Sequence, residues 1–245
     1  MAEQTIKIYK ARLARVFEQT ETTKHFEWEV LSSEPFRFTP GQFISLTHEF
    51  EGKVHTRAYS IASPPRDANR INLCLNRVPG GLFSNFLCDL APGAVIQFEG
   101  PFGFFTLREP LERDAVFIAT GTGIAPIRAM LAYLLQRGTD RQVWLIFGVR
   151  YPRSILYRDE FEELARPGGL ARRHPNFHFI PTLSRPDESW QGATGHVQGH
   201  VQRLFARRSD FEAYICGLKR MVDEMRAILK QMGLDRKAIR YEKYD

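Results

Sequence analysis

The stretch HTRAYSIAS, from His55 to Ser63, brings together an arginine, an aromatic ring and a hydroxyl at Arg57, Tyr59 and Ser60. Its alternation predicts a β-strand, and we expect the strand to aim all three groups at one surface. A guanidinium matches the geometry of a phosphate, a ring packs on a flat conjugated system, and a hydroxyl forms hydrogen bonds without filling much space. Taken alone, the motif is better explained as an ordinary strand aromatic beside an exposed charge.

A second candidate for chemistry is the loop ATGTGIAPIRAM, which follows a predicted strand and opens a predicted helix. Gly121 and Gly123 let the backbone approach a ligand closely, and Pro126 suits the first helical turn. The free amide groups at such a helix N-terminus favour a phosphate-bearing ligand. Two glycines in a tight turn explain a lone motif equally well, but the strand and helix on either side favour the phosphate interpretation. The sequence has no Walker lysine and therefore does not indicate phosphoryl transfer.

Short alternating segments position the first motif. Turn-forming residues separate these segments, which predicts a small antiparallel barrel. One helix is expected among them, in GLFSNFLCDL, because Phe83, Phe86, Leu87 and Leu90 recur at helical spacing. The expected strands are IKIYKARLARVFE, KHFEWEVL, QFISLTHEF, TRAYSIAS, RINLCLNRV and AVIQFEG.

The pattern changes near residue 108. Continuous apolar strands then alternate with helices, which predicts a parallel sheet covered on both faces. Ligands of such sheets bind beyond the carboxyl ends of the strands, so the loops that open at Thr120, Gly148, Ser184 and Gly217 are the expected location of chemistry. The fold class is therefore a two-domain chain, with an antiparallel β-barrel followed by an α/β Rossmann-like parallel sheet.

Composition limits the possible functions. The 245 residues are 43% hydrophobic and 12% aromatic, which argues against disorder. There are 11 basic and 11 acidic residues up to Leu107, but 23 basic and 17 acidic residues after it. This surplus favours anionic ligands or an acidic protein, although a solvated basic surface explains it equally well. Nucleic acid fits poorly, because the arginines are scattered and no recognition motif accompanies them.

Cysteine use and hydropathy exclude further classes. Cys74, Cys88 and Cys216 are too scattered for zinc or for an iron–sulfur cluster, so any cluster must belong to a partner. No apolar run is long enough to cross a membrane, and the polar start MAEQTIKIYK does not suit a signal peptide. We expect a cytoplasmic monomer that binds neither membrane nor nucleic acid.

Two histidine pairs have helical spacing, His174 with His178 and His196 with His200. Pro175 and the strand-like NFHFI argue against a helix at the first pair, and neither pair has a carboxylate or cysteine at ligand spacing. We therefore expect no metal.

Seven stretches, taken in order, resemble the ferredoxin–NADP+ reductase family: RAYS, GGLFSNFLCDLAPG, GPFG, ATGTGIAP, LYRDEF, ICGLKRM and YEKYD. The resemblance covers almost the whole chain. It implies an FAD-binding β-barrel domain over residues 1–107 and an NAD(P)-binding α/β domain over residues 108–245. The dioxygenase reductases resemble the chain less, because prolines usually stand in them where this chain has GLKRM.

The resemblance gives the opening motif its expected roles. Arg57 pairs with the FAD pyrophosphate, the Tyr59 ring lies on the isoalloxazine, and Ser60 approaches the flavin N5. Gly81 and Ser84 match a second phosphate contact at the start of a helix, a location that suits an anion. The further expected FAD residues are Leu73, Cys74 and Leu75, for which core packing is an equally good explanation, and Tyr244.

For the pyridine nucleotide, the resemblance implies pyrophosphate contacts at Thr122 and Gly123. It also implies that Cys216 and Gly217 lie beside the nicotinamide. Glu242 is expected to orient the nicotinamide and to relay a proton. The implied catalytic residues are thus Ser60, Cys216 and Glu242, with Cys216 shaping the pocket and not acting as a nucleophile.

The chain departs from the family pattern at two places. Tyr244 matches the terminal aromatic residue that covers the flavin, but Asp245 follows it. Ser184 and Arg185 match the pair that holds the 2′-phosphate in NADP-specific members. However, His196 stands where an adenine-stacking tyrosine is usual, and no basic residue directly precedes it. NADP(H) is therefore the expected nucleotide, with NAD(H) as the alternative.

The resemblance implies an FAD-dependent reductase that moves electrons between NADPH and a separate acidic carrier, ferredoxin or flavodoxin, by hydride transfer at flavin N5. An alternative is an NADH-preferring reductase component of an oxygenase or of a flavin or ferric system. Another is a non-catalytic flavin- or nucleotide-binding module, which would leave Ser60, Cys216 and Glu242 without an obvious purpose.

Overall fold

The computed structural model describes residues 7–65, 69–166 and 174–244. The chain divides into two compact units. The N-terminal unit comprises Met1–Leu107 together with Arg128–Tyr133, and the C-terminal unit comprises Arg108–Ile127 together with Leu134–Asp245.

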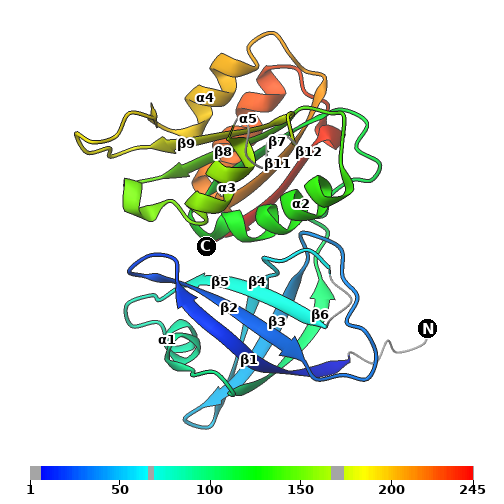
Figure 1. The fold of residues 1–245 in the computed structure, drawn as a ribbon, viewed down its shortest axis with the longest axis vertical. Helices are drawn as coiled ribbons and strands as arrows, with labels where there is room; N and C mark the ends of the chain where they lie inside the picture. Colours follow the sequence, from blue (N-terminus) through cyan, green and yellow to red (C-terminus); the bar gives the residue numbers. More distant parts are fainter. Residues whose placement is uncertain (1–6, 66–68, 167–173, 245) are drawn as a thin grey trace. The chain divides into compact units, whose positions relative to one another are not determined.

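The N-terminal unit is a six-stranded antiparallel sheet with the strand order β4-β3-β6-β1-β2-β5 (Figure 1). The strands β4 and β5 end this order, and a bridge joins Ile61, directly after β4, to Leu73 of β5. The expected antiparallel barrel architecture is confirmed. The elements are β1 (Ile8–Glu18), β2 (Thr23–Val30), β3 (Phe43–Phe50), β4 (Lys53–Ser60), β5 (Arg70–Asn76), α1 (Leu82–Asp89) and β6 (Val95–Phe102).

Alternate strand residues supply the core of the N-terminal unit. Trp28 on β2 and Phe98 on β6 are each 1% exposed, and α1 adds Phe83 and Leu87 to the same cluster. Burying such large apolar side chains is the main favourable contribution to folding. Helix α1 therefore packs through the helical stripe that its sequence predicts, with Phe86 and Leu90 partly buried beside it.

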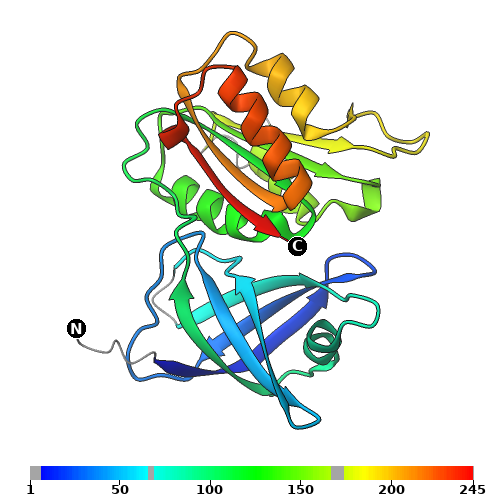
Figure 2. The same cartoon turned by 180° about the vertical axis from the view of Figure 1, so that it is seen from behind.

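The C-terminal unit is a parallel sheet with the order β10-β9-β8-β7-β11-β12. Helices α4 and α5 cover one face, whereas α2 and α3 lie on the other (Figures 1 and 2). The expected parallel sheet with helices on both faces is confirmed. The elements are β7 (Asp114–Thr120), η1 (Gly121–Gly123), α2 (Ile124–Arg137), β8 (Val143–Val149), η2 (Pro152–Ser154), α3 (Arg158–Ala165), β9 (Phe177–Leu183), β10 (Ala193–Thr194), α4 (Val197–Leu204), β11 (Phe211–Leu218), α5 (Lys219–Gln231), η4 (Arg236–Ala238) and β12 (Ile239–Tyr244).

The last strand, β12, was not anticipated as a strand from the sequence pattern. It mixes apolar, aromatic and charged residues, IRYEKY, because it lies at the end of the sheet and only part of its surface is buried. Its backbone pairs with β11 from Ala213 opposite Ile239 to Leu218 opposite Tyr244.

A buried polar network ties the first residue of the C-terminal unit to β11. Glu212 is 2% exposed, and its carboxylate accepts hydrogen bonds from the Tyr214 hydroxyl at 2.7 Å and from Arg108 Nη1 at 2.9 Å. The Arg108 amide donates to the same hydroxyl at 3.1 Å. Burial raises the pKa of Tyr214, so the phenol keeps the proton that it donates.

Removing that hydroxyl is expected to destabilise the protein. Tyr214→Phe leaves the buried Glu212 carboxylate and the Arg108 amide with fewer partners, at a cost of about 1–3 kcal/mol in the free energy of unfolding. Urea unfolding followed by circular dichroism measures this cost. Tyr9→Phe is the matched control and should change the same free energy by less than about 0.5 kcal/mol. Equal effects of the two substitutions would contradict the importance of the network.

Candidate functional site

Strand β4 places Arg57 and Tyr59 on the side that faces the core of the N-terminal unit. In the antiparallel register, Arg57 lies opposite Leu46 and Tyr59 opposite Ile44, and both of these partners are buried. The Tyr59 ring packs on the core beside Phe83, with 6.2 Å between centroids. Arg57 is exposed and donates to the Thr56 carbonyl at 2.8 Å. This side of β4 thus offers an exposed cation next to a partly buried ring.

Ser60 does not share that side. It directly follows Tyr59, and successive side chains of a strand point to opposite sides. Ser60 is 7% exposed and lies opposite Phe43. The strand therefore presents Arg57 and Tyr59 together but not Ser60, which corrects the expectation of one common surface.

The three expected FAD residues on β5 are buried. Leu73 and Leu75 belong to the core cluster, and Cys74 is 6% exposed on the opposite side of the strand. Core packing is therefore sufficient to explain their types. A contact with FAD at these residues stays a prediction.

Gly81 and Ser84 form the turn into α1. A Cβ atom on Gly81 would lie 2.7 Å from Ser84 Oγ and 2.9 Å from Val78 Cβ, so the turn requires glycine. Ser84 Oγ accepts a hydrogen bond from the Val78 amide at 3.1 Å and donates to the Gly81 carbonyl at 3.4 Å. No side chain of the described residues caps the start of α1. Its first amide groups and the helix dipole suit an anion.

In the C-terminal unit, η1 and the end of β11 approach each other closely. A Cβ atom on Gly123 would lie 2.5 Å from the Cys216 carbonyl oxygen and 2.7 Å from Gly217 Cα. Gly217 has a φ of +144°, and a side chain there would collide with Thr120. Because neither position tolerates a side chain, Thr122 and the backbone of both loops lie together at the carboxyl end of the sheet.

Three expected site residues meet next to these glycines. Strand register places Cys216 opposite Glu242, and Tyr244 follows two residues later on the same side of β12. Burial and the Glu242 carboxylate raise the pKa of the Cys216 thiol well above its ordinary value, and a hydrogen bond with the Tyr244 side chain opposes that shift. A fully buried thiol with a raised pKa carries little thiolate, which disfavours nucleophilic chemistry. Asp245 lies outside the described residues.

The ends of β8 and β9 carry a group of arginines, only one of which was expected from the sequence. Arg185 Nη1 donates to the Tyr151 hydroxyl at 3.4 Å, and the Arg153 guanidinium lies 4.7 Å from the Tyr151 ring centroid. The Arg185 amide donates to the Arg150 carbonyl at 2.9 Å. Hydrogen bonding and the charge of Arg185, together with Arg153 and Arg150, lower the pKa of Tyr151. We refer to Arg150, Tyr151, Arg153 and Arg185 as the arginine cluster.

Backbone pairing positions the arginine cluster. The Ser184 amide donates to the Val149 carbonyl at 3.1 Å, which continues the β8–β9 ladder past the strand ends. Ser184 and the arginine cluster thus share one corner of the sheet. The sequence signal that could have revealed Arg150 and Arg153 is the basic run VRYPR directly after a buried strand.

In each histidine pair, one ring makes contacts within the protein that account for its position, namely His200 and His178. His200 is 6% exposed; its Nε2 lies 2.9 Å from the Thr194 carbonyl and 2.9 Å from Thr182 Oγ1. Its Nδ1 lies 3.1 Å from Arg203 Nη2. His178 stacks on Trp144 at 4.0 Å. Within the described ranges, no cluster of three or more His, Cys, Asp or Glu side chains could hold a metal ion.

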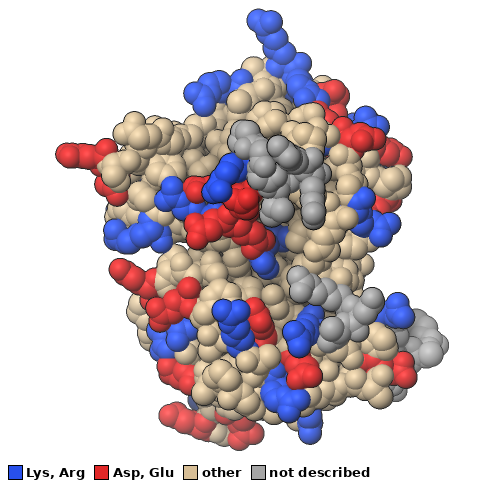
Figure 3. Space-filling model, viewed as in Figure 1, with Lys and Arg blue, Asp and Glu red and all other residues tan. Residues whose placement is uncertain are grey.

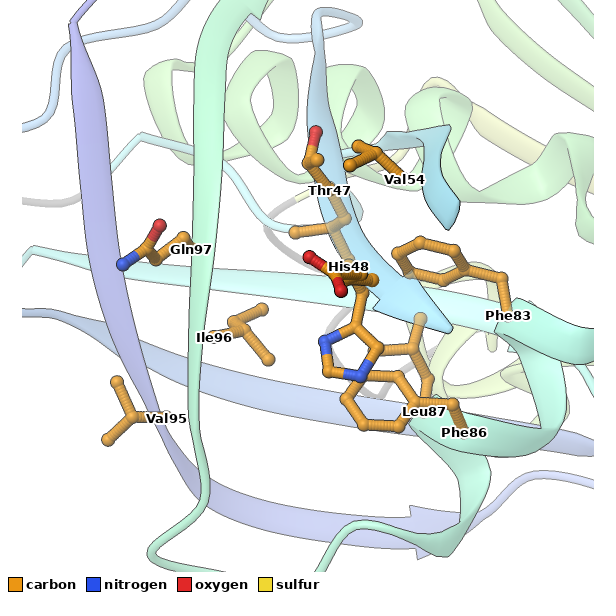
Figure 4. A pocket seen from close by; sticks show the side chains of 11 residues that line it. Thr47, His48, Val54, Phe83, Phe86, Leu87, Val95, Ile96 and Gln97 are labelled. Atoms are coloured by element: carbon orange, nitrogen blue, oxygen red, sulfur yellow. The ribbon is translucent and has the colours of Figure 1, made fainter. Parts of the chain in front are cut away.

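The N-terminal unit also contains a pocket of about 420 Å³ between β3, β6 and α1 (Figure 4). His48 and Phe86 stack within it at 4.0 Å, and Phe83, Leu87 and Ile96 line it. Its lining residues are distinct from those expected to bind FAD, but the pocket adjoins them, because Phe83 packs beside Tyr59 and Leu46 lies opposite Arg57.

Basic and acidic side chains are interspersed on the molecular face drawn in Figure 3. The net charge of +6 is thus not gathered into a single basic surface on that face. Among the described residues, no helix combines the length and the apolar character needed to cross a membrane.

Comparison with known families supports the two-part architecture. Residues 10–107 match the oxidoreductase FAD-binding domain family, and residues 117–227 match the oxidoreductase NAD-binding domain family. The chain is 36% identical over 244 residues to ferredoxin–NADP reductase B of Sorangium cellulosum (strain So ce56), a match that covers 97% of this chain and 98% of that protein. It is also 30% identical to phenol hydroxylase P5 protein of Acinetobacter pittii (strain PHEA-2), covering 96% of this chain but 65% of that protein.

Solved structures give the same fold. A ferredoxin NADP+ reductase from Neisseria gonorrhoeae with bound FAD and NADP has a TM-score of 0.80 and 24% identity, over 97% of this chain and 98% of that chain. The Amycolatopsis cytochrome P450 reductase GcoB has a TM-score of 0.86 and 26% identity, over 97% of this chain and 70% of that chain.

The buried ring of Tyr59 predicts a pH dependence of stability. Burial raises the pKa of Tyr59 to about 12, whereas an unfolded chain loses this proton near pH 10. The folded protein therefore binds more protons between these values, and its stability must fall as the pH rises through that interval. In Tyr59→Phe the fall should be smaller than in the wild type. Urea unfolding at a series of alkaline pH values measures it, and parallel curves would contradict the raised pKa.

Proposed function

This chain belongs to the ferredoxin–NADP+ reductase family, and we propose that it moves electrons between NADPH and a one-electron protein carrier by hydride transfer at the flavin. It is an oxidoreductase with an FAD-binding and an NAD-binding domain. Family membership supports an enzyme, so the non-catalytic binding module is set aside.

Residues of the N-terminal unit fit FAD. The exposed Arg57 guanidinium and the uncapped start of α1, which follows Gly81, both suit a pyrophosphate. The Tyr59 ring offers an apolar surface for a flat conjugated system. We assign Arg57, Tyr59 and Gly81 to the flavin. Ser84, Leu73, Cys74 and Leu75 are further assigned contacts.

When bound, FAD supplies the chemistry that joins a two-electron hydride donor to a one-electron acceptor. The protein has to hold the reacting rings in register and exclude other reactions. In this proposal, Ser60 would form a hydrogen bond with flavin N5, and Tyr244 would cover the flavin. Thr122, Gly123 and Gly217 would hold the dinucleotide, while Cys216 would shape the nicotinamide pocket and Glu242 would orient the ring and relay a proton.

The arginine cluster is the observation that favours NADPH. NADPH differs from NADH by one 2′-phosphate, and guanidinium groups recognise phosphate through charge-assisted, often paired hydrogen bonds. Arg185 and Arg153 contact Tyr151, Arg150 directly precedes it, and Ser184 lies at the same strand ends. We assign the arginine cluster and Ser184 to the 2′-phosphate.

We propose a ferredoxin or a flavodoxin as the carrier. The first relative described above is named as a ferredoxin–NADP reductase and is matched over 98% of its length. The net charge of +6 supports an acidic partner, because opposite charges speed association. The second candidate is an NADH-preferring reductase component of an oxygenase, which the similarity to the phenol hydroxylase P5 protein favours.

Anaerobic titration of the purified yellow protein with NADPH and with NADH, followed by flavin absorbance, tests the proposal. Bleaching at much lower NADPH than NADH concentration, followed by electron delivery to ferredoxin or flavodoxin, is expected. A preference for NADH would favour the oxygenase-type reductase. If neither nucleotide bleached the flavin, the proposed activity would be rejected.

Removing Arg185 tests the assignment of the 2′-phosphate. Arg185→Ala should weaken NADPH binding about 10- to 100-fold, since a hydrogen bond to a charged group contributes about 1.5–3 kcal/mol. NADH binding should change by less than about threefold, because NADH has no 2′-phosphate. Dissociation constants for both nucleotides measure the difference.

The matched control is Arg207→Ala, which removes an exposed arginine outside the arginine cluster. It should leave the ratio of NADPH to NADH affinity unchanged. An equal loss of both nucleotides in Arg185→Ala would contradict the assignment.

A further inference from the structure

Strand β12 carries two of the proposed site residues, although it lies at the end of its sheet. Its backbone pairs with β11, which is its neighbour in the strand order. An end strand receives ladder hydrogen bonds from one side only and frays more readily than an inner strand. The position of Glu242 and Tyr244 beside Cys216 therefore depends on what else holds β12.

Alternate residues of β12 face α5. Lys243 Nζ lies 2.7 Å from Asp223 Oδ1, and the Arg226 guanidinium lies 3.7 Å from the Tyr241 ring centroid. Arg226 Nη1 also lies 3.3 Å from Asp223 Oδ1, so one carboxylate joins both contacts. We call Asp223, Arg226, Tyr241 and Lys243 the α5 clamp.

The intervening β12 residues point the other way. Glu242 lies between Tyr241 and Lys243 in the chain, and alternation aims it at the opposite side, where its carboxylate acts on Cys216. Tyr244 lies on that side too and forms a hydrogen bond with Cys216. A shift of β12 by one residue would exchange these two sides.

The side chains of the α5 clamp are partly exposed, and several of them contact one another. The side chains of Arg226 and Lys243 are 22% and 31% exposed, and that of Asp223 is 44% exposed. Isolated pairs with such exposure contribute little, but a shared carboxylate and a cation over a ring act together. Lys243 lowers the pKa of Asp223 through its hydrogen bond, so the carboxylate stays ionised at neutral pH.

We propose that Asp223 and Arg226 of α5 are positioning residues that hold the C-terminal strand in register and thereby keep Glu242 and Tyr244 at Cys216. The consequence for hydride transfer rests on the function proposed above. The hold of α5 on β12 is independent of that function, because it follows from the contacts between these two elements.

The test uses charge-neutralising variants with controls on the same helix. Asp223→Asn is compared with Glu224→Gln, and Arg226→Gln with Arg220→Gln. Glu224 and Arg220 form an exposed ion pair with each other at 2.7 Å, so the controls remove the same charges from α5 without touching the clamp. For the alkylation measurement, all variants are made in full-length protein with Cys74 and Cys88 replaced by alanine, so that Cys216 is the remaining thiol. Flavin reduction is measured in protein that keeps all three cysteines, because Cys74 is assigned to the flavin.

The first readout is the alkylation rate of Cys216, which is fully buried in the intact strand arrangement. Asp223→Asn and Arg226→Gln should raise this rate at least about tenfold, because opening of β12 exposes the thiol and restores its ordinary acidity. Hydrogen exchange of the Tyr241–Tyr244 amides should accelerate in parallel. The controls should match the parent protein in both measurements.

The second readout is hydride transfer in the FAD-bound protein. At saturating NADPH, the rate of flavin reduction should fall about tenfold in the clamp variants, while the NADPH dissociation constant changes less than about threefold. Asp223→Glu, which keeps a carboxylate for both Arg226 and Lys243, should retain much of the rate. A merely destabilising role would lower the amount of folded protein but not the rate of flavin reduction in the folded fraction.

Two results would overturn the proposal. One is a Cys216 alkylation rate in Asp223→Asn equal to that in Glu224→Gln. The other is normal flavin reduction despite faster alkylation. If NADPH does not reduce the parent protein at all, the proposed function fails, whereas alkylation and hydrogen exchange still support or reject the hold on β12.

Discussion

The close approach of two backbones at Gly123 and Cys216–Gly217 is the constraint on which the C-terminal unit depends. A single methyl group at Gly123 would lie 2.5 Å from the Cys216 carbonyl oxygen, which is closer than real Cβ atoms approach. Since the strand ends can meet this closely only without side chains, the loop after β7 lies directly against the end of β11. That contact brings the amide groups of η1 and the buried thiol of Cys216 to the same edge of the sheet, and β12 then adds a carboxylate and a phenol from the next position.

In the N-terminal unit, the polar residues assigned to the flavin lie next to an apolar core. The residues assigned to the flavin come from β4, β5 and the turn into α1, and β4 and β5 end the strand order. The Ile61–Leu73 bridge joins the end of β4 to β5, so the residues assigned to the flavin come from neighbouring strands. Tyr59 combines both demands, because its ring packs beside Phe83 while its neighbour Arg57 stays exposed.

Electrostatic groups in the C-terminal unit are of two kinds. Glu212 is buried and joined to Arg108 and Tyr214, so it stabilises the start of the unit and is shielded from solvent. The arginine cluster is exposed and gathered at a strand-end corner, where it is available to a ligand. Exposed charges interact weakly in water unless several act on one anion, and the pairing of the β8 and β9 ends brings several arginines to one corner.

The sequence by itself determined the two-part architecture, because alternation with period two and buried strands between helices both arise from local side-chain patterns. Short glycine motifs and the order of seven segments were likewise sufficient to indicate the family. Tertiary structure alone decided three features. Strand β12 carries little periodic signal, since it lies at the end of the sheet and only part of its surface is buried. Ser60 turned out to lie on the other side of β4 from Tyr59. The convergence of Arg150 and Arg153 on Tyr151 beside Arg185, and of Asp223 and Arg226 on β12, depends on contacts between segments that local sequence does not encode.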